Sequence, residues 1–343
     1  MMKSKLFWPL VILILILLVN LIFDPSFFKI EVRNERLTGS LIDILHRGAP
    51  LMLISIGMTL VIATKGIDLG VGSVVAMSGA VAAMTVVGAS DETLIPFFLA
   101  ILFALGVSML TGIWNGLLVS RIGVQPIVAT LILMVAGRGV AQLITGGQIT
   151  TVYYKPYTFI GGGHLFMLPV SIFIVVFVLG MAIYLTRKTA IGLFIESVGA
   201  NPVASRLTGI NSKNIILMVY IFSGLCAGIG GLILSSNVAS ADGNNAGLWY
   251  ELDAILAVVI GGTSLMGGRF FLMGTVVGAL IIQSLTTTIY TIGIPVETTL
   301  VVKAIVVLIV CLLQSPEFRK KIMTIFQSSK EKKEVVKKGA TLS

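Results

Sequence analysis

Acidic residues beside glycine-rich segments are the first candidates for chemistry in this sequence. Asp68 lies within residues 65–73, where closely spaced glycines separate two apolar runs. Glycines interrupt a helix and leave backbone groups without partners, which a membrane tolerates only where protein or a water-filled cavity satisfies them. A carboxylate in such a break is costly, so Asp68 is a candidate for the path of a transported solute. Alternatively, Asp68 caps the following helix by accepting backbone N–H groups near Val71, and both roles are compatible.

A second glycine-rich segment repeats this arrangement further along the chain. Glu251 and Asp253 precede an apolar run, and residues 261–268 then read Gly-Gly-Thr-Ser-Leu-Met-Gly-Gly before the next apolar run. Repeated helix–break–helix patterns are typical of transporters built from two related halves, so we also place Thr263 and Ser264 on the path. The alternative for Glu251 and Asp253 is an acidic first helical turn, which the helix dipole stabilises. Neither segment has the spacing of a phosphate-binding loop.

Polar residues inside apolar runs form a third group, namely Asn115, Gln125, Arg138, Gln142, Gln283 and Lys303. Arg138 is the most costly of them in a bilayer, and we assign it to the path together with Asn115. Alternatively, Arg138 is a structural charge that is paired within the bundle or extends outward to the membrane surface. The two histidines have no Cys, His or carboxylate neighbours at ligand spacing, so we expect no metal site.

The longest polar loop, residues 187–214, is named the coupling segment. Four of its apolar residues recur at helical spacing before a break at Asn201-Pro202: Ile191, Phe194, Ile195 and Val198. A short amphipathic helix of this kind either lies on the membrane surface or docks a cytoplasmic protein. For the docking alternative the candidate residues are Phe194, Glu196, Gly199, Arg206 and Gly209.

The elements that must position these residues are membrane helices. Of the 343 residues, 56% are hydrophobic and 11% are charged, which excludes a soluble globular enzyme and a disordered chain. The predicted apolar runs are residues 6–23, 49–64, 71–89, 94–119, 127–145, 166–186, 215–238, 252–262, 272–290 and 299–313. Short runs flanked by glycine are candidates for broken or re-entrant helices. We therefore predict an all-α polytopic membrane bundle of about eight to ten transmembrane helices.

The distribution of charge predicts the orientation of the chain. The net charge is +9, and most of the 24 basic residues lie in segments that face one side, including a basic tail at residues 315–343. By the positive-inside rule this side is the cytoplasm, so both termini are cytoplasmic and residues 1–314 form the membrane domain. The basic ends then contact anionic lipids, and no nucleic-acid partner is expected.

With these residues in view, the chain resembles the permease subunits of bacterial ABC sugar importers of the ribose/xylose/arabinose/galactofuranose type. The similarity covers about residues 41–314, and its most specific parts are GMTLVIA at 57–63, GIDLGVGS at 66–73 and ELDAILAVVIGGTSLMGG at 251–268. Within that family the galactofuranose permeases are the most similar. Their similarity rests on ATLILMVAGRGVAQLIT at 129–145, which contains Arg138, and on NNAGLW at 244–249, which adds Asn244 and Asn245 to the predicted path.

The resemblance implies a transport subunit of the bacterial cytoplasmic (inner) membrane that performs no chemistry and binds no cofactor. A separate cytoplasmic ATPase subunit, which uses ATP and Mg, docks on the coupling segment. An extracytoplasmic sugar-binding protein and a second permease, either another copy or a paralogue, are the further partners that it implies. The alternatives are import of ribose or of another pentose or hexose and, from other classes, a secondary sugar transporter or a passive channel.

Overall fold

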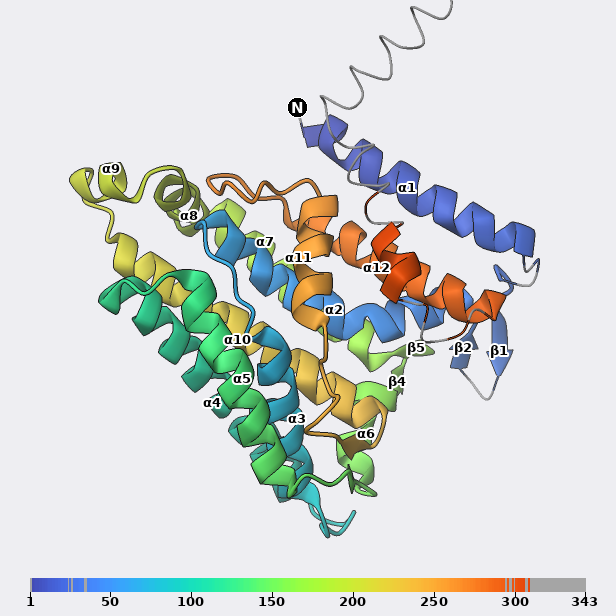
Figure 1. Ribbon diagram of the computed structural model, residues 1–343. Coiled ribbons are helices and arrows are strands. Elements are labelled where there is room, and N and C mark those ends of the chain that lie inside the picture. Colours follow the sequence, from blue (N-terminus) through green and yellow to red (C-terminus); the bar gives the residue numbers. More distant parts are fainter. Residues whose placement is uncertain are drawn as a thin grey trace, which may run out of the picture. The chain divides into compact units, whose positions relative to one another are not determined.

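The computed structural model in Figure 1 describes residues 2–23, 25, 27–33, 36–293, 295, 298, 300–305 and 308. Met1–Ile292 forms one compact unit and Gly293–Ser343 a second. The first unit contains every element with assigned bounds. The predicted basic tail and most of the tenth predicted apolar run lie outside the described residues.

Long helices make up most of the first unit, as an apolar sequence of this kind requires when backbone groups must be satisfied within the bilayer. They are α1 (Met2–Phe23), α2 (Ser40–Ala63), α4 (Ile95–Leu117), α5 (Pro126–Thr145), α7 (Val170–Lys188), α10 (Ser212–Asn237) and α12 (Leu272–Ile292). Helix α3 (Val71–Val86) is apolar but shorter, at 16 residues. A π-helical turn, η1 (Leu118–Ile122), extends α4. Within the described residues, 7 helices are long and apolar enough to cross a membrane, so the predicted polytopic all-α bundle is confirmed.

Short elements connect these helices. The short helices are α6 (Lys155–Gly162), α8 (Ile191–Ala200), α9 (Pro202–Leu207) and α11 (Tyr250–Ile260). The strands form two-residue or three-residue antiparallel pairs: β1 (Glu31–Arg33) with β2 (Arg36–Thr38), β3 (Thr150–Thr151) with β6 (Ser240–Ala241), and β4 (His164–Leu165) with β5 (Leu168–Pro169). The α8–α9 break is at the predicted place, because the Asn201 side chain accepts the N–H groups of Val203 and Ala204 and so caps α9.

The start of α2 differs from the prediction. The apolar run was expected to begin at residue 49, with the preceding polar stretch on the membrane surface, but α2 begins at Ser40. The polar residues of its first turns are accommodated within the fold, since the His46 ring nitrogens lie 2.8 Å from Ser171 Oγ on α7 and 3.1 Å from Asn237 Oδ1 on α10. These contacts give the His46 ring hydrogen-bond partners inside the bundle, which a prediction from hydropathy alone does not take into account.

Helix α10 lies at the centre of the unit and packs against α2, α3 and α4 (Figure 1). Small residues make this close packing possible. A Cβ atom on Gly112 would lie 2.7 Å from Tyr220 O, and one on Gly224 would lie 2.5 Å from Ser108 O. The α4–α10 contact therefore brings two backbones together, which fixes the helices that carry Asn115, Tyr220 and Ser223.

Two helix–break–helix units position the predicted path residues. The first break, residues 64–70, separates α2 from α3, and the second break, residues 261–271, separates α11 from α12. Helix α11 is only 11 residues long, which is too short to span a bilayer as a helix. The expected broken or re-entrant segment is therefore present at α11, while the repeat relation between the two halves stays a prediction.

Candidate substrate path and coupling site

A cavity of about 370 Å³ lies between α3, the C-terminal half of α10 and the segment that follows it. Small-molecule pockets have volumes of about 300–1,000 Å³ and combine apolar walls with a few polar groups. The polar or aromatic residues of this lining are Ser235, Ser240, Asp242, Asn245 and Tyr250. Of the predicted path residues, Asn245 lines this cavity, and Asn244 is its neighbour in the chain.

Asp242 organises the loop at this cavity. Its Oδ1 atom accepts the N–H groups of Asn244 at 2.8 Å and Asn245 at 3.1 Å, and its Oδ2 atom accepts Nδ2 of Asn245 at 2.8 Å. Burial favours the protonated carboxyl, but these hydrogen bonds and the nearby Arg138 outweigh it and hold the pKa of Asp242 below its ordinary value. The carboxylate is thus kept ionised, and it fixes the orientation of the Asn245 amide.

Arg138 links α5 to the same loop. Its Nη1 atom donates to the carbonyl oxygen of Ala246 at 2.5 Å, and its guanidinium interacts electrostatically with Glu251 and Asp242. The predicted pairing of Arg138 within the bundle is therefore present. It is compatible with a path role, since Asp242 and Ala246 both line the cavity.

Glu251 lies at the start of α11 and is 3% exposed. Its Oε2 atom has no hydrogen-bond partner among the described residues. A Cβ atom on Gly72 would overlap this oxygen and would lie 2.5 Å from Gly247 O, so the Gly72 backbone of α3 packs against the Glu251 side chain and against the segment that precedes α11. The guanidinium of Arg138 interacts electrostatically with the Glu251 carboxylate. Glu251 and Asp253 form the predicted acidic first turn of α11.

Asp68 lies in the first break and is fully enclosed, at 4% exposure. Its Oδ1 atom accepts the Gly70 N–H at 3.1 Å and Asn115 Nδ2 at 3.4 Å, and its Oδ2 atom accepts the Ser223 hydroxyl at 3.1 Å. Of the predicted capping interactions of Asp68 near Val71, only the hydrogen bond from the Gly70 N–H is present, because no side chain in the described part of the chain caps the first turn of α3. The carboxylate joins the break to α4 and α10.

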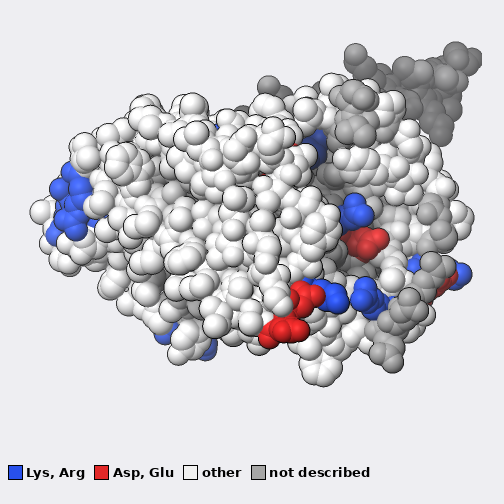
Figure 2. Space-filling model, turned by 90° about the horizontal axis from the view of Figure 1, so that it is seen from below, with Lys and Arg blue, Asp and Glu red and all other residues white. Residues whose placement is uncertain are grey.

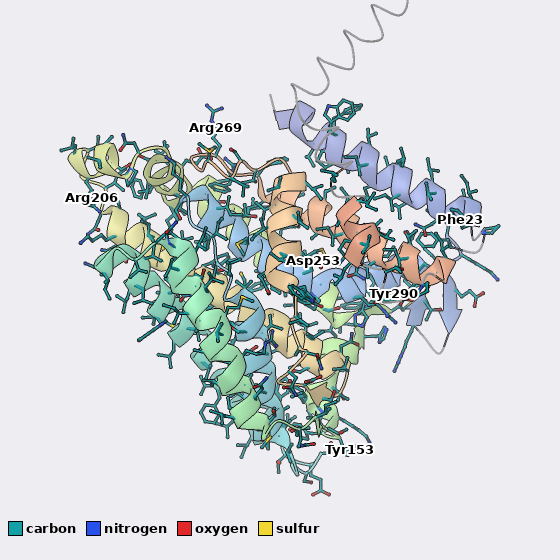
Figure 3. The ribbon with its side chains drawn as sticks, viewed as in Figure 1. Phe23, Tyr153, Arg206, Asp253, Arg269 and Tyr290 are labelled. Atoms are coloured by element: carbon teal, nitrogen blue, oxygen red, sulfur yellow. The ribbon has the colours of Figure 1, made fainter. Side chains whose placement is uncertain are left out.

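The remaining predicted path residues lie elsewhere. Thr263 Oγ1 accepts the Phe271 N–H at 3.0 Å, and Ser264 Oγ accepts the Met266 N–H at 3.2 Å, so both hydroxyls organise the second break. Figure 3 shows Arg269 of this break near α8, whereas Asp253 on α11 lies nearer the middle of the molecule. The predicted path residues therefore fall into separate groups: one at the cavity, one around Asp68 and one in the second break.

The coupling segment forms α8 and α9, as its periodicity predicts. Ile195, Val198 and Gly199 are buried against the bundle, Phe194 and Glu196 are partly buried, and Arg206 and Gly209 are exposed. Arg187 at the end of α7 lies over the Phe270 ring at 5.2 Å and 3.7 Å from the Glu196 carboxylate. The segment is thereby held against the second break.

Charged side chains are sparse over much of the surface. On the face in Figure 2 they gather in a few patches that are separated by broad uncharged areas. This distribution is what a protein with lipid-facing helices requires, because a charge in the bilayer core is costly.

Sequence reasoning missed several residues of these groups. Ser223 on α10 donates to Asp68, and the hydroxyl of Tyr220, one turn earlier, lies against Gly66 of the same break, yet both lie in an ordinary apolar run. Asp242 begins the sequence Asp-Gly-Asn-Asn at 242–245, a pattern typical of a turn that an aspartate side chain stabilises. Lys65 was counted only as a basic residue, although its Nζ atom donates to Ala200 O at 3.0 Å.

Comparison with known proteins identifies the family. The family model described as "Branched-chain amino acid transport system / permease component" matches residues 40–311. The chain belongs to this permease family. No solved structure matches it.

Curated relatives cover nearly the whole permease. The galactofuranose transporter permease protein YtfT of Escherichia coli (strain K12) is 54% identical over 92% of this chain and 93% of its own length. The fructose import permease protein FruF of Bifidobacterium longum is 42% identical over 92% and 89%. The ribose import permease protein RbsC of Haemophilus influenzae is 38% identical over 88% and 90%. The predicted resemblance to permeases of sugar importers is confirmed.

Proposed function

We propose that this permease is the membrane subunit of an ATP-driven sugar importer and that galactofuranose is its sugar. The observation that carries the proposal is the 54% identity, over nearly the full length of both chains, to a galactofuranose transporter permease. The lower identities of 42% to a fructose permease and 38% to a ribose permease support the choice of sugar.

The cavity beside α10 is the proposed sugar site. Asp242, Asn245, Ser235 and Ser240 offer hydrogen-bond acceptors and donors for sugar hydroxyl groups, and Tyr250 offers an aromatic surface. Because buried polar groups need partners, a sugar that satisfies them is favoured over one that leaves them unpaired. Transport then requires the cavity to be reached alternately from the two sides of the membrane, with Arg138 and Glu251 at its edge.

We propose that a partner ATPase supplies the energy for this movement. A cytoplasmic ATPase, which binds ATP and Mg, docks on the coupling segment, and the permease itself binds neither. An extracytoplasmic sugar-binding protein delivers the sugar, and a second permease, either a copy or a paralogue, completes the transporter. Basic residues concentrate in the coupling segment and the C-terminal tail, so both termini are assigned to the cytoplasm of a bacterial cell with the permease in its inner membrane.

Uptake by cells tests the choice of sugar. The permease is expressed with its cognate ATPase and binding protein in a strain that lacks galactofuranose, ribose and fructose import, and the entry of each radiolabelled sugar is measured. We expect galactofuranose to enter at least about tenfold faster than ribose or fructose, because a site built on hydrogen bonds rejects ligands that leave them unmade. Faster entry of ribose or fructose would contradict the choice of galactofuranose. Entry of none of the three sugars would contradict the proposed role as an importer of these sugars.

A further inference from the structure

The two glycine-rich breaks meet at one point of the fold. The Gly268 N–H in the second break donates to Ala63 O, the last residue of α2, at 2.9 Å. Within the helices that flank the breaks, the hydroxyls of Thr59 on α2 and Thr275 on α12 lie 2.8 Å apart. The C-terminal end of α2 is therefore attached to the second break by a backbone hydrogen bond and to α12 by a side-chain hydrogen bond.

Helix α8 of the coupling segment ends at the same point. A Cβ atom on Gly199 would overlap Ala63 O and would lie 2.6 Å from Gly268 N, so the backbones of α8, α2 and the second break touch there. Lys65 adds a side-chain link, because its Nζ atom donates to Ala200 O, at the last residue of α8, at 3.0 Å. A cation at a helix C-terminus also interacts favourably with the helix dipole.

Lys65 holds an unusual backbone conformation to make this link. Its φ is 64°, in the left-handed region that residues other than glycine rarely adopt. The sequence uses lysine there although the next residue, Gly66, is a glycine. Strain of this kind persists where the surroundings impose it, and it is concentrated at functional sites.

The chain that follows Lys65 reaches the centre of the bundle within a few residues. Asp68 accepts hydrogen bonds from Asn115 on α4 and Ser223 on α10, so the first break is anchored at both ends. A hollow of about 550 Å³, lined by Lys65, Ala200 and Arg269 among others, adjoins the α8 contact. The contact between Lys65 and α8 therefore borders a hollow, whereas the Asp68 carboxylate is enclosed by the bundle.

We propose that Lys65 is a positioning residue that transmits movement of α8 to the first break, and through Asp68 to α4 and α10. This inference rests on the proposed function, in which a partner ATPase moves the coupling segment. Lys65 is not among the residues that line the proposed sugar site. It acts by holding the end of α8 to the segment that ends at Asp68, so that displacement of α8 displaces the break.

The test measures coupling, meaning sugar molecules imported per ATP hydrolysed, in proteoliposomes that hold the permease with its ATPase and binding protein. For Lys65→Met we expect this ratio to fall by at least about fivefold, in the range of typical coupling effects, while ATP hydrolysis without sugar and binding protein stays near that of the wild type. Lys65→Arg keeps a cation that can donate to Ala200 O and should restore most of the ratio. Lys155→Met, which removes the exposed lysine that faces Asp91, is the matched control.

A second variant separates transmission from folding. Glycine adopts the left-handed conformation without strain, so Lys65→Gly should melt at or above the wild-type temperature and still lose the coupling ratio as Lys65→Met does. A wild-type ratio in Lys65→Met or Lys65→Gly would overturn the inference. A wild-type transporter that imports no sugar with ATP would instead contradict the proposed function, so the two failures are distinguishable.

Discussion

Replacing Asp68 by alanine is expected to lower the free energy of unfolding by about 3 kcal/mol, because buried donors that lose their acceptor each cost about 1–3 kcal/mol. The carboxylate accepts hydrogen bonds from the Gly70 N–H, Asn115 and Ser223, and the side chain is 4% exposed. Alanine leaves these donors without their acceptor in the interior. The first break then loses its attachment to α4 and α10, so sugar uptake should fall along with stability.

Asp68→Asn is the matched variant. Its amide oxygen can still accept from Gly70 and Asn115, and its NH₂ group can donate to the Ser223 hydroxyl, which both donates and accepts. We therefore expect Asp68→Asn to lose less than half of the stability that Asp68→Ala loses. Chemical unfolding of purified protein in detergent, together with uptake by cells, gives both quantities. Full stability and full uptake in Asp68→Ala would refute the anchoring role and a path role alike.

Replacing Arg138 by methionine is expected to reduce sugar uptake by about tenfold or more, because removing one partner of a buried, hydrogen-bonded charge pair costs about 2–5 kcal/mol and partial exposure lowers that figure. Arg138 holds the cavity loop through Ala246 O and is the cation that faces Glu251 and Asp242. Without it, both carboxylates lose the cation that faces them and the loop loses its contact with α5. Initial rates of uptake over a range of sugar concentrations measure the effect.

Two further variants make the Arg138 test specific. Arg138→Lys keeps the charge but not the planar guanidinium, so it should recover part of the rate. Arg36→Met removes the same charge from an exposed strand residue and should transport like the wild type. Equal uptake by Arg138→Met and Arg36→Met would show that Arg138 does not shape the cavity.

Much of the helical architecture can be predicted from the sequence, because a membrane span must be apolar along its length. The runs that became α4, α5, α7, α10 and α12 were located within a few residues of their observed bounds. The start of α2 was missed, since hydropathy counts His46 as unfavourable and cannot include its contacts with Ser171 and Asn237. The hydropathy of a single segment does not include hydrogen bonds between polar residues on different helices, so it cannot predict which polar residues a helix accommodates.

The same limit applies to the candidate site. A carboxylate beside a glycine-rich break can be recognised from the sequence, and Asp68 and Glu251 were found in this way. Asn115 and Arg138 were found as polar residues inside apolar runs, but Ser223 was not, because it is 155 positions from Asp68 and only the packing of α10 against α3 and α4 brings the two together. Thr263 and Ser264 were assigned to the path by their place in a similar pattern; their hydroxyls accept backbone N–H groups of the second break, and their path role stays a prediction.

Transport by this permease is proposed to use energy from a partner ATPase. The most direct measurement is uptake of radiolabelled galactofuranose into proteoliposomes that contain the permease, its cognate ATPase and its binding protein, with ATP and Mg on the side of the ATPase. We predict accumulation against a gradient with ATP, and none with ADP or with an ATPase variant that cannot hydrolyse ATP. Accumulation by the permease alone under an ion gradient, or equilibration without ATP, would contradict ATP-driven import.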